Sequence, residues 1–487
     1  MNVIERSQFF VGGAWVGPKG DGIVEVISPN DESLIGHFPE ATTADVDVAV
    51  ETARRAFDDG SWRRAPVQQR IDVARRLGTL IGSRSGEFIQ LIINEMGAPI
   101  SGGAGAAGQV LGVPVLVDLL TGFATDFPWI SERSAPGGVS RSLVVHEPVG
   151  VVGAIIPWNG PLFLAMAKMV PALISGCTVV VKPAPETALD AYLLAEIASE
   201  AGIPPGVLSI VPGGREAGAH LVAHPLVDKI TFTGSTAAGR QIAAVCGQQL
   251  KRASLELGGK SAAIVLDDAD MSTTIPALVA GGLGNNGQQC FALSRVLVSS
   301  TRHGELVDAL ASTFGALRVG HALDPATELG PLISAAQRDR VEGYIARGTS
   351  DGARILTGGR RPTGLDKGWY VEPTLLDGVD NRSAVAQEEI FGPVISVIEY
   401  RDEADALAKA NDSIFGLSGA VFTEDVSHGV DIAREVRTGT FHVNHFGGNL
   451  AAPFGGFKCS GIGREWGPEG LSDFTELKTI NLPPAAG

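Results

Sequence analysis

Cysteine is scarce in this sequence, and no two cysteines stand close together. The chain has four cysteines in 487 residues and no Cys-x-x-Cys motif, so neither a zinc ribbon nor a redox dithiol is predicted. Four widely spaced cysteines do not make a disulfide scaffold either. Their scarcity favours a reducing compartment, and we expect a cytoplasmic location and no bound metal.

Positive charge and long apolar runs are also in short supply. The net charge is −16, from 38 basic and 54 acidic residues, which disfavours a nucleic-acid or membrane partner because both attract a positive field. The most apolar run, residues 110–120, is interrupted by Pro114 and Asp118 and is too short to cross a bilayer. The first ten residues include Glu5 and Arg6 and lack the apolar core of a secretion signal.

The remaining composition is globular, with 44% hydrophobic and 19% charged residues, and the length predicts two or three domains. Two amphipathic helices come first, one with Thr43 as its N-cap and the next with Pro66 near its first turn. Predicted strands and helices then alternate from residue 150: strands at 150–156, 178–182, 207–211, 229–233 and 262–266, helices near 161–175, 187–201, 215–223 and 236–246. This alternation predicts an α/β fold with a doubly wound parallel sheet, which binds ligands beyond the carboxyl ends of its strands.

A second α/β set begins near residue 294. Its predicted strands are 294–299, 353–357, 394–400, 417–423 and 439–443, and its helices lie near 303–318, 335–348, 402–410 and 427–435. This pattern predicts two doubly wound α/β domains with a cleft between them. Two extended segments, 140–147 and 477–482, belong to neither set, and such strands often pair across subunits. They predict a small β oligomerisation element in a homodimer or homotetramer.

Three ligand-binding motifs are incomplete in this sequence. Residues 258–261 read Gly-Gly-Lys-Ser, like the end of a P-loop, but Ser254 stands where its first glycine is required. No Gly-x-Gly-x-x-Gly follows a predicted strand. His220 and His224 have the spacing of a zinc protease motif, but Leu221 replaces its glutamate. A histidine pair on a helix surface is the preferred interpretation.

Cys290 lies among glycines and side-chain amides rather than among hydrophobic residues, and Glu256 precedes a pair of glycines. A thiolate adds to carbonyl carbon, a carboxylate can activate water to cleave the resulting thioester, and amide donors can hold the oxyanion. Asn159, which follows the strand 150–156, and the backbone N–H of Cys290 are candidate donors. Taken singly, these residues could equally be a core cysteine, a surface carboxylate and a turn residue.

Six motifs, in order along the chain, resemble those of the NAD(P)-dependent aldehyde dehydrogenase superfamily. They are Pro157-Trp158-Asn159, Phe232-Thr233-Gly234-Ser235, the glutamate segment 255–260, the cysteine segment 286–290, Glu388-Glu389-Ile390-Phe391-Gly392-Pro393 and Pro453-Phe454-Gly455-Gly456. The resemblance runs from about Phe10 to Ile480. It implies a cofactor-binding domain at 1–128 and 149–257, a catalytic domain at 258–458, and an oligomerisation element at 129–148 and 474–487.

The resemblance also implies catalytic roles. Cys290 would attack an aldehyde, and loss of hydride from the thiohemiacetal would give a thioester. Glu256 would activate the water that releases the acid, Asn159 would hold the oxyanion, and Lys168 would complete the catalytic set. CoA-acylating relatives generally lack the glutamate, so hydrolysis to the free acid is expected. A thiol esterase that uses the same Cys290 and Glu256 is the alternative, although it would need no dinucleotide site.

The resemblance implies a dinucleotide-binding site made of twelve residues. Lys182 would bind the adenosine ribose, Ser235 the pyrophosphate at a helix N-terminus, and Glu389 with Phe391 the nicotinamide end. The full set is Ile156, Pro157, Trp158, Lys182, Pro185, Glu186, Gly234, Ser235, Leu257, Gly258, Glu389 and Phe391. Relatives often carry, where Pro185 stands, a glutamate that repels a 2′-phosphate; Glu186 follows one residue later, so NAD is preferred and NADP stays open.

The substrate channel departs most from the relatives. Gly160, Ala167 and Gly284 stand where many relatives have aromatic residues. A channel without these bulky walls is wider, and no arginine is evident there to bind a second carboxylate. We therefore expect a bulky hydrophobic aldehyde, aromatic or long-chain. The predicted lining is Gly160, Phe163, Ala167, Phe291, Phe446 and Phe454.

Overall fold

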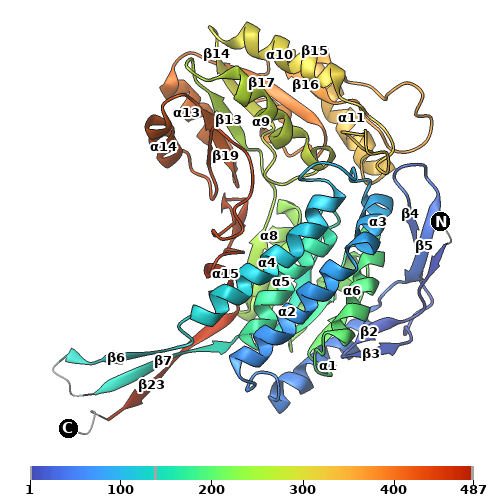
Figure 1. Ribbon diagram of the computed structural model, residues 1–487, viewed down its shortest axis with the longest axis vertical. Coiled ribbons are helices and arrows are strands. Elements are labelled where there is room, and N and C mark those ends of the chain that lie inside the picture. Colours follow the sequence, from blue (N-terminus) through green and yellow to red (C-terminus); the bar gives the residue numbers. More distant parts are fainter. Residues whose placement is uncertain (1–2, 137–139, 484–487) are drawn as a thin grey trace.

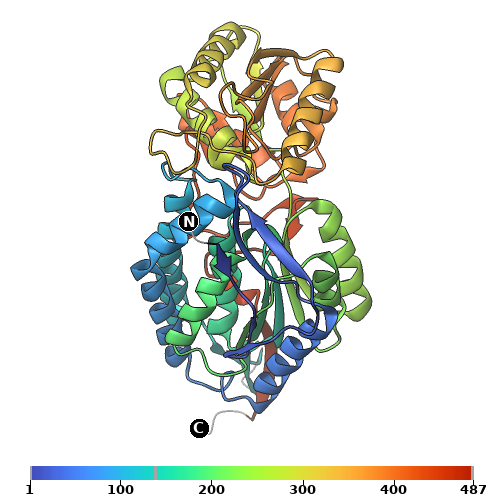
Figure 2. The ribbon, with the colours of Figure 1, turned by 90° about the vertical axis from the view of Figure 1, so that its right-hand side faces the viewer.

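Two mainly parallel sheets organise the chain, one in each half of the molecule (Figures 1 and 2). The computed structural model describes residues 3–136 and 140–483. The first sheet has eight strands, in the order β22 (Gly461–Ile462), β12 (Arg252–Glu256), β11 (Lys229–Thr233), β8 (Val151–Ile155), β9 (Thr178–Lys182), β10 (Leu208–Ile210), β2 (Phe9–Val11) and β3 (Ala14–Val16). The strand farthest along the chain, β22, runs antiparallel beside β12.

Helices cover both faces of this sheet because its strands alternate between two buried sets of side chains. Val152 and Ala154 of β8 belong to one hydrophobic cluster, whereas Val151 and Ile155 belong to another. The first cluster packs against α2 (Val67–Ser83), α3 (Ser85–Met96), α4 (Ala106–Asp126), α5 (Pro161–Ser175) and α6 (Leu189–Glu200). The second packs against α1 (Thr43–Asp59), α7 (Arg215–Ala223) and α8 (Thr236–Gln249).

The second sheet lies in the upper half of Figure 1 and has seven strands. Their order is β15 (Arg354–Thr357), β16 (Thr374–Asp377), β17 (Val394–Tyr400), β14 (Arg295–Ser299), β13 (Ala262–Val265), β19 (Gly419–Phe422) and β20 (His442–Val443). The helices of this half are α9 (Met271–Leu283), α10 (His303–Ala316), α11 (Ala335–Ser350), α12 (Ala384–Gln387), α13 (Glu403–Asn411) and α14 (Val426–Glu435). The predicted α/β fold class with two such sheets is confirmed.

A three-stranded sheet projects from the lower half of Figure 1 as an arm. It consists of β6 (Ile130–Ser134), β7 (Arg141–Pro148) and β23 (Thr475–Leu482), all antiparallel. The extended segments predicted at 140–147 and 477–482 therefore pair with each other. The remaining elements are β1 (Ile4–Glu5), β4 (Ile23–Ile27), β5 (Leu34–Pro39), β18 (Phe415–Gly416), β21 (Phe457–Lys458), α15 (Glu469–Ser472) and two 3-10 turns, Pro185–Thr187 and Gly284–Gly287. The predicted domain ranges also include residues 1–2, 137–139 and 484–487, which lie outside the described residues.

Two local predictions are wrong. The N-cap of α1 is Thr42 rather than Thr43, because Asp45 stands three residues after Thr42 and completes a reciprocal capping box with it. The apolar run at 110–120 is not ended by Pro114; it lies inside the 21-residue helix α4, which is long and apolar enough to span a membrane by length and composition alone. Its buried face packs on α2 and α5 within the first hydrophobic cluster, whereas Leu111 and Val115 are exposed.

Candidate active site

The loop before Cys290 is held in an unusual backbone conformation by its own amide side chains. Asn285, Asn286 and Gly287 all have positive φ angles, of 52°, 59° and 73°. The Asn286 side chain donates to the carbonyls of Gly97 and Pro331 and accepts from the backbone N–H of Gly330. These bonds stabilise left-handed backbone that few residues adopt. The amides that surround Cys290 in the sequence thus anchor its loop.

Asn159 joins this loop from the end of β8. Its side-chain amide donates to the carbonyl of Gln288 at 3.1 Å, and its own carbonyl accepts from the Asn285 side chain at 2.9 Å. The predicted oxyanion donor is therefore fixed beside the segment that carries Cys290. One of its two amide hydrogens is engaged by Gln288, which leaves the other to face a ligand.

Cys290 is partly exposed, and its surroundings oppose ionisation. Burial raises the pKa of its thiol well above the usual range, and the carboxylates of Glu389 and Glu256 raise it further. The negative charges of these two glutamates thus disfavour the thiolate form of Cys290. The backbone of Gly259 approaches the carbonyl of Cys290 so closely that a side chain there would collide with it. This contact brings the backbone of Cys290 close to the segment that follows Glu256.

Glu256 ends β12 and is 4% exposed. Burial raises its pKa well above the usual value and Glu465 raises it further, whereas Lys168 and Arg464 act in the opposite direction. Neither of its carboxylate oxygens has a hydrogen-bond partner among the described residues. Lys168, on α5, forms a buried ion pair with Glu465. The predicted catalytic lysine is therefore ion-paired with Glu465, and its charge lowers the pKa of Glu256.

The predicted adenosine end of the cofactor site lies beyond β9 and β11. The Lys182 ammonium donates to the carbonyls of Pro183 and Gly213, at 2.9 and 2.7 Å. Burial lowers its pKa to about 8, while nearby Glu186, which is exposed, opposes this shift. Ser235 is the N-cap of α8 and accepts from the backbone N–H of Ala238. A lysine, a carboxylate and a helix N-terminus at one sheet edge suit a ribose followed by a pyrophosphate.

The predicted nicotinamide end lies closer to Cys290. Glu389 accepts from the backbone N–H of Gly259 at 3.0 Å, and burial raises its pKa to about 7. Phe391, with a φ of 63°, meets Trp158 edge to face at 5.2 Å between ring centroids. Gly258 lies against the Glu389 carboxylate so closely that a Cβ there would collide with it. The other predicted contacts are buried Ile156 and Leu257 and the partly exposed Pro157, Pro185 and Gly234. These residues fit a dinucleotide.

Aromatic rings line the predicted substrate channel in a continuous series. Phe446 stacks on Phe291, Phe291 meets Phe454 edge to face, and Phe454 stacks on Trp466 at 4.6 Å. Phe163 then meets Trp466 edge to face. The four predicted phenylalanines are all half-buried, as a channel lining requires, while the small residues Gly160 and Ala167 are buried.

Sequence reasoning missed three residues of this region. Trp466 links Phe163 to Phe454 in the aromatic series, Glu465 is the partner of Lys168, and Gln109 of α4 donates to Asn285. The Gln109 side-chain oxygen also lies 3.7 Å from the position that a Cβ of Gly160 would take. None belongs to the six motifs used in the prediction, although Glu465 and Trp466 follow the last one by about ten positions.

His220 and His224 are indeed neighbours, and Asp47 of α1 lies beside them. The side-chain oxygen of Asp47 is 2.5 Å from His220 and 3.4 Å from His224, so three potential metal ligands meet here. However, Nδ1 of His224 accepts a hydrogen bond from the backbone N–H of Leu226. Its Nε2 must then carry the proton in the neutral ring, which suits donation to Asp47 and not coordination. The hydrogen-bonded pair remains the preferred interpretation.

Comparison with known proteins agrees with this geometry. The sequence pattern described as "Aldehyde dehydrogenase family" matches residues 15–480. The chain belongs to the aldehyde dehydrogenase family. It is 46% identical over 482 residues to a geranial dehydrogenase from Castellaniella defragrans, covering 98% of this chain and 99% of that one. It is 41% identical to a 3-succinoylsemialdehyde-pyridine dehydrogenase from a Pseudomonas species, covering 97% and 98%.

Solved structures of the family superpose closely. An aldehyde dehydrogenase from Mycobacterium tuberculosis, complexed with NAD+, gives a TM-score of 0.96 at 45% identity and covers all of both chains. A mutant of aldehyde dehydrogenase C from Pseudomonas syringae, with NAD+ and octanal, gives 0.93 at 37% identity, covering 97% of this chain and 96% of that one. The predicted family and the predicted enzyme class, an aldehyde dehydrogenase that acts on a small-molecule aldehyde, are confirmed.

Proposed function

We propose that this aldehyde dehydrogenase oxidises a bulky hydrophobic aldehyde to the free carboxylic acid, with NAD+ as the hydride acceptor. The observation that carries the proposal is the convergence at one sheet edge of a thiol, a buried carboxylate and a fixed amide donor. Cys290 is faced by Glu256, and Asn159 is bonded to the loop of Cys290. Each residue supplies one function that covalent aldehyde oxidation requires.

The chain's own groups account for the covalent steps. Cys290, which is partly exposed, releases its thiol proton to water and attacks the aldehyde carbon, and the oxyanion accepts hydrogen bonds from the Asn159 amide and the backbone N–H of Cys290. When bound, NAD+ supplies the hydride acceptor that turns this adduct into a thioester. Glu256 then takes a proton from water, the hydroxide adds to the acyl carbon, and the C–S bond breaks to return Cys290. The presence of Glu256 favours hydrolysis over transfer to CoA.

NAD is proposed over NADP because of Glu186. This carboxylate is close enough to Lys182 to raise the pKa of that lysine, so it lies near the predicted adenosine ribose. A 2′-phosphate there would meet a negative charge. The NAD+ complexes of the Mycobacterium and Pseudomonas relatives support the same choice. A kcat/KM that favours NADP would refute it.

The substrate class rests on the channel. Its predicted walls are aromatic, and glycine or alanine stands at residues 160 and 167 in place of bulkier side chains. The relative named geranial dehydrogenase and the neighbour solved with octanal support a hydrophobic aldehyde. Because another relative is named 3-succinoylsemialdehyde-pyridine dehydrogenase, a semialdehyde is the alternative substrate class to assay.

A panel of aldehydes tests this proposal directly. Geranial, octanal, benzaldehyde, acetaldehyde and succinic semialdehyde are each assayed with NAD+ and with NADP+ at saturating cofactor. We expect geranial, octanal or benzaldehyde to give the highest kcat/KM. A highest value for succinic semialdehyde would refute the substrate class. Ester cleavage with no aldehyde-dependent NADH formation would favour the thiol esterase instead.

We also propose that the arm of β6, β7 and β23 joins subunits in a homodimer or homotetramer. Leu477, Ile480 and Ile130 on these strands are 63%, 41% and 62% exposed, an apolar surface that a partner strand could cover. All four cysteines are free thiols, which supports a cytoplasmic location.

A further inference from the structure

Polar side chains line one face of two neighbouring strands beneath Glu256. In the parallel register of β11 and β12, Thr231 lies opposite Ser254 and Thr233 lies opposite Glu256. All four residues are buried, and both threonine hydroxyls lack a hydrogen-bond partner among the described residues. Buried hydroxyls of this kind are normally bonded to ordered water. A polar, water-binding strip therefore runs along the sheet from Glu256.

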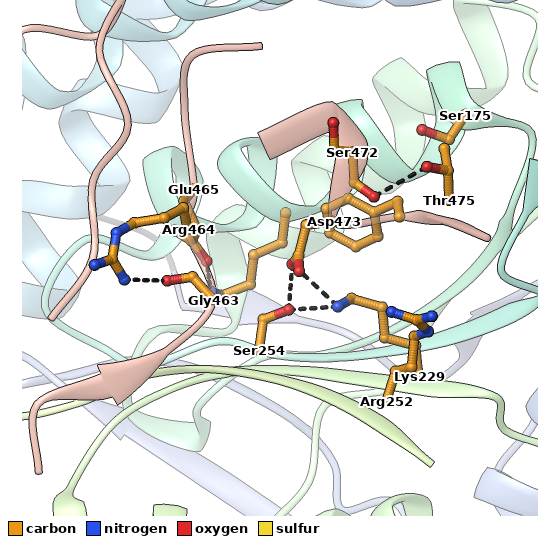
Figure 3. A network of polar contacts seen from close by, with 12 residues as sticks. Ser175, Lys229, Arg252, Ser254, Gly463, Arg464, Glu465, Ser472, Asp473 and Thr475 are labelled. Carbon is orange, nitrogen blue, oxygen red and sulfur yellow. Dashed lines mark hydrogen bonds and ion pairs between the residues drawn. The ribbon is translucent and has the colours of Figure 1, made fainter. Parts of the chain in front are cut away.

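A directed hydrogen-bond network occupies the far end of this strip (Figure 3). The Lys229 ammonium donates to the Ser254 hydroxyl, and that hydroxyl donates to the Asp473 carboxylate. Lys229 also pairs with Asp473 directly, at 3.0 Å. The Lys229 side chain is 1% exposed whereas that of Asp473 is 22% exposed. The network thus leads from the buried strand face to the surface.

Two glycines connect the surroundings of Glu256 with this network. A methyl group on Gly455 would clash with both Glu256 Oε1 and the carbonyl oxygen of Gly463, at 2.8 Å, so Gly455 lies directly against both atoms. A methyl group on Gly463 would in turn meet Ser254 Cβ at 3.3 Å and Asp473 Oδ1 at 3.6 Å. Residues two apart on a strand are separated by roughly 6.6 Å, a gap that one bridging water spans.

We propose that Ser254, Lys229 and Asp473 form an outlet through which the proton that Glu256 takes from water reaches the surface. The inference rests on the proposed function, because only thioester hydrolysis loads Glu256 with this proton. The proton passes from Glu256 to a bridging water and on to the Ser254 hydroxyl, which gives its own proton to Asp473. Asp473 then releases a proton to solvent, so that every group regains its starting state.

Burial and two neighbouring carboxylates favour proton uptake by Glu256, the first step of this path. Glu465 and Asp473 raise its pKa, whereas Lys168 and Arg464 lower it. Around Lys229, the charge of Asp473 raises the pKa, against burial and Arg252, which lower it. Ser254, Lys229 and Asp473 do not touch the reacting atoms. They are positioning residues, so replacing them should change the rate of proton transfer.

Ser254→Ala tests the outlet with little disturbance, because the ion pair between Lys229 and Asp473 remains. Ser254→Thr is the matched control, since it keeps the hydroxyl. The enzyme is mixed rapidly with NAD+ and octanal, and the acyl adduct on Cys290 is followed by quench and mass spectrometry. We expect unchanged formation and decay of the first adduct, but roughly 5- to 20-fold slower steady turnover in Ser254→Ala, because Glu256 must lose its proton before it can act again. Ser254→Thr should turn over within about twofold of the unaltered enzyme.

A structural role alone would not change how steady turnover depends on pH or on deuterated water. We expect the solvent isotope effect on steady turnover to increase in Ser254→Ala, and the same in Asp473→Asn, with recovery in Asp473→Glu. Steady turnover that is equal in all variants would overturn the outlet. If the unaltered enzyme forms no adduct, the proposed function itself fails. If Ser254→Ala does not fold, the two Asp473 variants decide the question.

Discussion

Replacing Lys168 with methionine leaves the Glu465 carboxylate buried without a counter-charge. The side chains of the pair are 0% and 6% exposed, so water cannot replace the lost ammonium. Removing one partner of a buried ion pair costs about 3–5 kcal/mol. At about 2–4 °C per kcal/mol for a domain of this kind, the melting temperature of Lys168→Met should fall by roughly 6–20 °C.

The double variant Lys168→Met with Glu465→Gln is the control, because it removes both charges. We expect it to be more stable than Lys168→Met by most of that loss, since no unpaired charge remains buried. Urea and thermal unfolding of the unaltered enzyme, both single variants and the double variant give the coupling energy. A loss below about 1 kcal/mol in Lys168→Met, or a double variant no more stable than Lys168→Met, would refute the reasoning.

The same substitution should change catalysis in a defined direction. The Lys168 charge lowers the pKa of Glu256, so its removal should raise that pKa. Glu256 accepts a proton only as a carboxylate. The rate of adduct decay in Lys168→Met should therefore reach half of its maximum at a higher pH than in the unaltered enzyme, as a stopped-flow pH series would show.

Three further predictions follow from other parts of the molecule. Burial beside Glu95 raises the pKa of Asp190 from 3.8 to about 8, so its protonated form stabilises the fold at low pH, and that stability is lost as the pH rises from about 4 to about 8. Asp190→Asn should therefore gain stability relative to the unaltered enzyme by on the order of 1 kcal/mol per pH unit between pH 5 and 8. A stability difference between the two proteins that is the same at pH 5 and at pH 8 would contradict this. Ala167→Trp should lower kcat/KM for octanal by about tenfold or more relative to acetaldehyde, and an equal loss for both would argue against a channel at this position. Leu477→Asp should shift the enzyme towards monomers in sedimentation velocity, and an unchanged distribution would remove the arm from the subunit interface.

Much of the fold could be predicted from the sequence because buried parallel strands are short, apolar and bounded by turns. The predicted strands at 178–182 and 229–233 and helices at 161–175 and 215–223 agree with the structure at both ends. The strand β12 was missed because it alternates polar and apolar residues: Ser254 and Glu256 face the polar strip while Leu255 faces the core. That pattern does not look like a buried strand.

Only those residues of the site that belong to sequence motifs could be predicted. Cys290, Glu256 and Asn159 stand in motifs, and the structure brings them together, but their roles stay predictions. Glu465 and Trp466 could not be predicted, because their positions depend on the return of the chain to the first sheet through β22. In the sequence, the amides near Cys290 served only to distinguish it from a core cysteine. Asn285 and Asn286 are loop anchors, which only three-dimensional hydrogen bonds reveal.

Rapid mixing of Glu256→Gln with NAD+ and octanal tests the central claim most directly. If Cys290 is the nucleophile and Glu256 the water activator, this variant should release a burst of NADH approaching one per subunit. Steady turnover should then be about 10²-fold slower or more, with an acyl adduct on Cys290. Cys290→Ala should give neither burst nor turnover. Retained turnover in Cys290→Ala, or a first hydride transfer slowed as much as acid release in Glu256→Gln, would contradict the account.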